Sequence, residues 1–219
     1  MSMICWLLGL TPTQISALRA APSLVSNVAM AAQGAERKAR FEELINRMTP
    51  ERRRQVETNR ATSEASAAVN LLQARIAEAG ERIAALGPIE HALSLEKSWH
   101  MLHFLLTGRV DPSGIPGDLL LTGEALGEDL GYGPARLHSN TTTREFSRFI
   151  ETQDLAALQA RVDLEDMSER VVYAMPEGAG PRGVYEDELR NEATRYFLLL
   201  RDYVCKMSEK GNGLLVWLS

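Results

Sequence analysis

Two histidines share an apolar segment near the middle of the chain with a tryptophan and a carboxylate. The segment LEKSWHMLHFLLTG contains Glu96, Trp99, His100 and His103. If residues 95–107 form one helix, Glu96, His100 and His103 lie on one stripe beside an apolar stripe. An imidazole pair next to a carboxylate could transfer protons near neutral pH. A buried structural role is the alternative, and the apolar neighbours favour it for His103.

A glycine-rich segment further along the chain, GEDLGYGPARL, holds a second set of reactive side chains. It lacks the Lys-Ser/Thr ending of a phosphate-binding loop, and its glycine spacing does not match the dinucleotide fingerprint. Two interpretations remain, a ligand-facing loop or a tight turn whose acids cap backbone N–H groups, and the turn is favoured. The two segments together define a candidate cleft, which consists of His100, His103, Glu128, Asp129, Tyr132 and Arg136.

Neither segment supplies a complete metal or nucleophile site. His100 and His103 could meet one ion with a carboxylate, but most zinc sites recruit a further ligand, and no spacing identifies one. The only cysteines, Cys5 and Cys205, are far apart and form no Cys-x-x-Cys pair. The chain also lacks a Gly-x-Ser-x-Gly elbow. We therefore expect no metal and no cofactor.

Apolar runs and helix caps predict the elements in the first two thirds of the chain. An apolar strand over residues 3–10 ends at Thr11-Pro12, a pair typical of the start of a helix. Thr143 and Asp154 are the predicted caps of two short helices.

The last third of the chain predicts one long helix between two strands. Residues 171–173 resemble a short strand, and the glycines and prolines of residues 178–183 predict a surface loop. Apolar residues at helical spacing predict a helix over residues 189–207, which ends at the glycines of residues 211–213. Residues 214–218 are apolar throughout, so we expect this strand to pair inside a sheet. Long helices between a few separated strands indicate an α+β fold.

Residues 34–87 differ in composition from the rest of the chain, because alanine, arginine and glutamate dominate there. Within residues 65–86 the apolar residues alternate at four and three positions, which predicts a helical hairpin or a coiled coil that could join copies of the chain. The members of this seam are Ala65, Val69, Leu72, Ile76, Ala79, Ile83 and Leu86. The basic run at residues 52–54 has no interleaved aromatic residues, so we interpret it as a solvated helix face.

Composition and charge limit the classes of partner. With 219 residues and a net charge of −5, the chain lacks the basic surface that nucleic-acid binding needs, and an acidic body suits a basic protein partner or a small polar ligand. No apolar run approaches the roughly 18 residues of a membrane span. The first residues, MSMICWLLGL, have no basic leader and no cleavage site, so we expect a cytoplasmic protein with no membrane contact.

LEKSWHMLHFLLTG, GEDLGYGPARL, the strand ending at Val172-Tyr173 and the closing KGNGLLVWLS together resemble the YfbM-like family of small bacterial proteins, domain of unknown function family 1877. The resemblance covers residues 1–20 and 88–219. It implies one compact α+β domain over residues 1–219, in which a layer of helices packs on a small mixed sheet. Residues 34–87 are then an inserted helical hairpin by which this chain departs from shorter relatives. The resemblance implies no established reaction.

Two functional hypotheses follow. The first is a non-enzymatic cytoplasmic protein that binds a partner or ligand, in the manner of an immunity protein or antitoxin, because the catalytic set is incomplete and a long hairpin is appended. The rival is a hydrolase-like or transferase-like enzyme that uses His100 and His103 with Glu128 or Asp129. The rival requires those four side chains to converge within hydrogen-bond reach.

Overall fold

The computed structural model describes residues 3–63, 67–112, 114, 117–173, 175 and 182–219. The predicted loop at residues 178–183 lies largely outside the described residues. In chain order the elements are β1 (Cys5–Leu10), α1 (Pro12–Ala20), η1 (Pro22–Leu24), α2 (Val25–Asn46), α3 (Pro50–Ser63), α4 (Ala67–Ile83), η2 (Ala84–Leu86), β2 (Leu93–Glu96), α5 (Trp99–Thr107), β3 (Glu124–Asp129), β4 (Pro134–His138), α6 (Asn140–Glu151), α7 (Leu155–Ala160), α8 (Leu164–Glu169), α9 (Arg182–Glu209) and β5 (Gly213–Leu218).

The described strands form one five-stranded sheet in the order β2-β1-β5-β4-β3. Its centre is the pair of strands from the two ends of the chain, in which Cys5 lies opposite Leu218 and Leu10 lies opposite Gly213. Every pair of neighbouring strands is antiparallel, so the prediction of a mixed sheet was wrong. Long helical connections permit either strand direction, and apolar patterns alone do not distinguish them.

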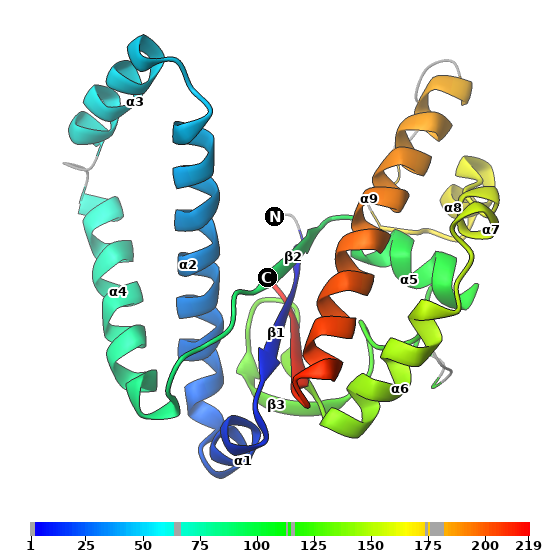
Figure 1. The fold of residues 1–219 in the computed structure, drawn as a ribbon, viewed down its shortest axis with the longest axis horizontal. Helices are drawn as coiled ribbons and strands as arrows, with labels where there is room; N and C mark the ends of the chain where they lie inside the picture. The colour runs from blue at the N-terminus through cyan, green and yellow to red at the C-terminus, as the bar shows by residue number, and fades with distance from the viewer. Residues whose placement is uncertain (1–2, 64–66, 113, 115–116, 174, 176–181) are drawn as a thin grey trace.

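Helices cover both faces of the sheet (Figure 1). Cys5, Leu7 and Val216 point to the face that packs against α5, α6 and α9. Leu8 and Leu215 point to the opposite face, which packs against α1 and the first turns of α2. The alternation along each central strand therefore gives a three-layer α+β architecture, because successive side chains of a strand point to opposite faces.

The predicted helical hairpin is present and begins earlier than expected. Helices α2 and α4 run side by side, and α3 connects their far ends (Figure 1). The first turns of α2, from Val25 onward, belong to the core of the body. Along the hairpin, Ile76 lies so close to Gly34 that a side chain there would meet it at 3.0 Å. None of the described helices combines the length and apolar character that a bilayer crossing needs.

Two features of the site region differ from the prediction. Leu95 and Glu96 lie on β2 rather than on the helix, because α5 begins at Trp99. The glycine-rich turn is flanked by strands β3 and β4, which the short and mostly polar sequence did not predict. The start of α5 at Trp99 separates Glu96 from the stripe that it was predicted to share with His100.

Two predictions in the second half were also wrong, while others were confirmed. The N-cap of α6 is Ser139 and not Thr143, whose side chain is buried. The predicted strand at residues 171–173 is a turn after α8, where Val171 adopts a φ of 59°. The caps at Thr11 and Asp154 and the final helix and strand were confirmed.

Gly213 allows the centre of the sheet to close. A side-chain carbon at this position would lie 2.3 Å from the carbonyl oxygen of His138 and 2.6 Å from Cδ1 of Ile15. We therefore expect Gly213→Ala to lower the free energy of unfolding by about 1–3 kcal/mol or more, because overpacking forces backbone shifts. Urea denaturation measures the change.

Gly80→Ala is the matched control, because no atom lies within 4 Å of the added carbon. Inside helix α4, alanine should stabilise the protein by about 0.5–1 kcal/mol. Equal stability of the Gly213→Ala variant and the wild type would show that the sheet can move apart at this point.

Candidate functional site

His100 connects two loops through both of its ring nitrogens. Its Nε2 lies 2.9 Å from the carbonyl oxygen of Val110, and its Nδ1 accepts a hydrogen bond of 2.8 Å from the backbone N–H of Tyr173. A carbonyl can only accept, so the imidazole carries its proton on Nε2 and is neutral. The ring also stacks on Trp99, with centroids 4.8 Å apart. These contacts give His100 a structural role.

His103 is sealed in the core, with no exposed surface. Its Nδ1 lies 3.4 Å from Oδ1 of Asp118, which is also buried. Burial lowers the pKa of His103 below its ordinary value, although the carboxylate of Asp118 favours the charged form. The expectation of a buried structural role for His103 agrees with this geometry. Substrate has no access to its ring.

Asp129 organises the turn between β3 and β4. Its Oδ1 accepts hydrogen bonds of 2.7 Å from the N–H of Gly131 and 2.9 Å from the N–H of Gly133. These two bonds lower the pKa of Asp129, which is a solvent-exposed group. Glu128 is also exposed. Within the described ranges, no hydrogen bond or ion pair joins His100 or His103 to either acid.

Tyr132 and Arg136 are the two residues of the candidate cleft that the structure brings together. They line a hollow of about 100 Å³ at the ends of β4 and β5. We call it the Arg136 hollow, and its lining residues are Leu120, Leu121, Tyr132, Pro134, Arg136, Val216, Trp217 and Leu218. The six predicted residues therefore do not form one site, because His103 has no surface and His100 is engaged by backbone.

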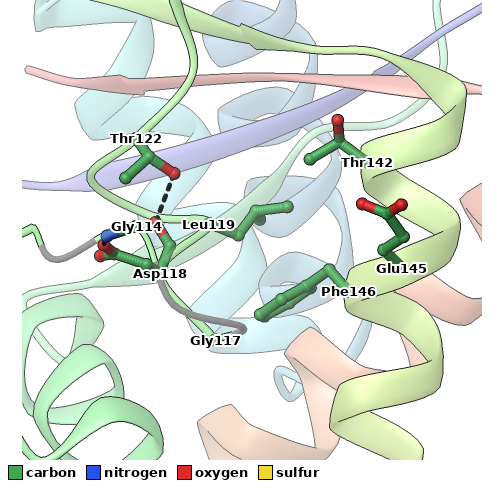
Figure 2. Close-up of a pocket in the computed structure, with 8 residues that line it drawn as sticks. All are labelled: Gly114, Gly117, Asp118, Leu119, Thr122, Thr142, Glu145 and Phe146. Atoms are coloured by element: carbon green, nitrogen blue, oxygen red, sulfur yellow. Dashed lines mark hydrogen bonds between the residues drawn. The ribbon is translucent and has the colours of Figure 1, made fainter.

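A larger pocket of about 400 Å³ lies between α6 and the loop that precedes β3 (Figure 2). We call it the α6 pocket, and its lining residues are Gly114, Gly117, Asp118, Leu119, Thr122, Thr142, Glu145 and Phe146. Figure 2 shows Leu119 and the ring of Phe146 on its apolar side. The carboxylate of Glu145 and the hydroxyl of Thr142 stand beside them on α6.

Asp118 holds the loop that forms one wall of the α6 pocket. Its Oδ2 accepts a hydrogen bond of 2.7 Å from the N–H of Gly114, and its carbonyl oxygen accepts one of 2.7 Å from the hydroxyl of Thr122 (Figure 2). Gly117 has a φ of 100°, and a side chain there would meet the ring of Phe149 at 2.8 Å. The wall therefore depends on a glycine that leaves room for the ring of Phe149 on α6.

The sequence analysis did not identify the residues of the α6 pocket. The available signal was the segment DPSGIPGD, in which two prolines and two glycines lie between two aspartates. Such a segment predicts a shaped loop, but Thr142 and Glu145 lie on an ordinary amphipathic helix. Only the fold shows that this loop and this part of α6 line the same pocket.

The described residues do not form a metal site, because no cluster of three or more His, Cys, Asp or Glu side chains occurs among them. Cys5 is fully buried, and burial raises the pKa of its thiol far above the ordinary value. A thiol in this state is a poor nucleophile.

Comparisons with known proteins support the fold that the sequence predicted. The sequence model of a family described as "Domain of unknown function (DUF1877)" matches residues 1–217. The structure is similar to that of YfbM from Escherichia coli, a protein of unknown function, with a TM-score of 0.57 and 15% identity over 99% of both chains. This identity shows a shared fold alone. No curated protein matches the chain.

His138 makes the stability of the site region depend on pH. It is buried beside the backbone of Leu119 and Thr122, and burial lowers its pKa from 6.5 to about 4. Between these values the unfolded chain binds a proton that the folded chain does not. Stability is therefore complete above pH 6.5 and falls as the pH drops toward 4.

We expect the free energy of unfolding to fall by about 3 kcal/mol over this pH range through His138 alone. His138→Gln should flatten the dependence by about one proton in urea denaturation series at several pH values. The exposed His91 provides the control, and His91→Gln should leave the slope unchanged. A slope that His138→Gln does not alter would contradict the assignment.

Proposed function

We propose that this chain, which belongs to the DUF1877 family of unknown function, is a non-enzymatic binding protein whose α6 pocket takes a small ligand. The α6 pocket is the observation that carries the proposal. Its volume of about 400 Å³ lies within the range of roughly 300–1,000 Å³ found for small-molecule sites. Its lining combines an apolar side with a few polar groups, as in most ligand sites.

The charges around the α6 pocket favour a ligand with a cationic group. Among the described residues, no lysine or arginine forms an ion pair with Glu145. Its carboxylate stands beside the apolar surface of Phe146 and Leu119 (Figure 2). An ammonium group could pair with Glu145 while an aromatic or aliphatic body packs on Phe146, and the hydroxyls of Thr122 and Thr142 offer further hydrogen bonds.

Catalysis by the candidate cleft has less support. Both ring nitrogens of His100 already contact backbone atoms, and His103 has no exposed surface. A general base must reach a substrate proton directly or through one water. The oxygens of Asp129 serve the β3–β4 turn instead.

A primary amine tests the proposal. We expect 2-phenylethylamine to bind the protein more tightly than the neutral 2-phenylethanol, measured by calorimetry or by NMR titration. Thr142→Phe should fill the pocket, and Glu145→Gln should remove the charge-assisted contact. Each change should weaken amine binding by about tenfold, which corresponds to about 1.4 kcal/mol.

Thr141→Phe is the matched control, because Thr141 is the exposed neighbour of Thr142 on α6 and does not line the pocket. It should leave binding within about twofold, a change of less than 1 kcal/mol. Equal binding of the amine and the alcohol, or an unchanged affinity of Thr142→Phe, would contradict the proposal.

Self-association through the helical hairpin is a second candidate function. Leu44, Leu71 and Leu72 are 54%, 63% and 47% exposed near the α3 end of the hairpin. The predicted seam is only partly used within the chain, where Ile76 lies against Gly34 of α2 and Ala79 is buried. Residues 70–86 carry two arginines and two glutamates, so two copies of this stretch would not repel each other.

Light scattering tests this second candidate. The wild type should have the mass of a dimer, and Leu72→Asp should return it to the monomer, because a buried unpaired carboxylate is costly. Gln73→Asp adds the same charge at an exposed polar neighbour and should leave the dimer intact. A monomeric wild type at concentrations of tens of micromolar would exclude the hairpin interface.

A further inference from the structure

The Arg136 hollow is a site distinct from the α6 pocket. Arg136 and Tyr132 supply its polar groups, and Pro134, Val216 and Leu218 form part of its apolar wall. At about 100 Å³ it is well below the size of a typical drug-sized pocket. Any ligand is therefore limited to a few heavy atoms.

The alternation of side chains along β4 determines which face of the sheet Arg136 points to. Its neighbours Ala135 and Leu137 belong to the core on the α2 side of the sheet. Because successive side chains of a strand point to opposite faces, Arg136 points to the α6 side. There it lies beside Val216, which is its partner in the register of β4 and β5.

Arg136 lacks a counter-ion in the described parts of the chain. None of the described carboxylates forms an ion pair with it, and none of the described oxygens accepts a hydrogen bond from it. The residue is partly buried. A guanidinium between apolar walls loses part of its hydration, and an anion in the hollow would replace those lost interactions.

We propose that the Arg136 hollow binds the carboxylate of a small aliphatic acid. A guanidinium offers parallel N–H donors that match the two oxygens of a carboxylate. The apolar walls formed by Leu120, Leu121 and Pro134 suit a short alkyl chain. A doubly charged anion fits less well, since Arg136 is the only cation in the lining and the walls would desolvate the second charge.

Butyrate is the probe that tests this inference on the full chain. In an NMR titration we expect saturable shifts of the backbone amides of Val216 and Leu218, with a dissociation constant in the millimolar range. Butyramide has nearly the same shape without the charge, and it should produce no saturable shift. Inorganic phosphate should bind at least about tenfold more weakly than butyrate, about 1.4 kcal/mol.

Two variants separate charge from geometry. Arg136→Gln should weaken butyrate binding by about tenfold or more, and Arg136→Lys by about fivefold, because a lysine keeps the charge without the paired donors. Arg75→Gln, an exposed change on α4, should leave the affinity unchanged. If Arg136→Gln fails to fold, Arg136→Lys decides alone, and an unchanged affinity then overturns the proposal.

Three results would overturn it directly: equal binding of butyramide, phosphate binding as tight as butyrate binding, or unchanged butyrate affinity in Arg136→Gln. None of these results bears on the amine proposed for the α6 pocket. The amine experiment uses Thr142 and Glu145, which lie outside the Arg136 hollow.

Discussion

The pairing of β1 with β5 is the constraint on which the rest of the structure depends. The two strands come from opposite ends of the chain and pair over six residues each at the centre of the sheet. Leu7, Leu8 and Leu214 are fully buried there, so both faces of the pair need helices to cover them. Trp6 and Trp217 stack on one face, with ring centroids 6.2 Å apart. All other elements lie between these two strands in sequence, so their final packing requires both chain ends to meet. We therefore expect cooperative unfolding of the body, because the central pair forms only after a long loop has closed.

The same alternation that builds the two cores also positions the ligand-facing groups. On β4, Ala135 and Leu137 enter the core on the α2 side, which leaves Arg136 and His138 on the α6 side. The segment from Asp118 to Thr122 crosses this side and contributes to both cavities. Leu119 lines the α6 pocket, while Leu120 and Leu121 line the Arg136 hollow. One loop thus separates an acidic pocket from a basic hollow, and the Asp118 carboxylate beside His103 anchors it to the core.

The sequence predicted the elements whose signals are local. Thr11 with Gln14 forms a capping box, and the apolar stripe of α9 and the apolar strand β5 follow from their periods alone. The strand pair β3–β4 was missed because its exposed edge alternates weakly and its turn residues dominate the pattern. Helix α5 was extended too far, since Leu95 and Glu96 fit a helical stripe as well as a strand. Pairing with β1 makes this segment a strand rather than a helix, and β1 is far away in the sequence.

The candidate site was predicted only in part, for a physical reason. Sequence reasoning selects side chains by the chemistry they could perform. A buried histidine loses that chemistry when its ring nitrogens are already hydrogen-bonded within the fold. His100 bonds the backbone through both nitrogens, so the polar atoms that could bind a ligand instead hold two loops together. The sequence named Arg136 as part of the candidate cleft but did not single out Glu145. Each lines a cavity, and none of the described residues forms an ion pair with either. A charged side chain that lies next to apolar surface, and has no ion-pair partner in the protein, is stabilised most by a ligand of opposite charge. Binding capacity in this fold therefore lies where the charges are unmatched rather than where reactive residues are densest.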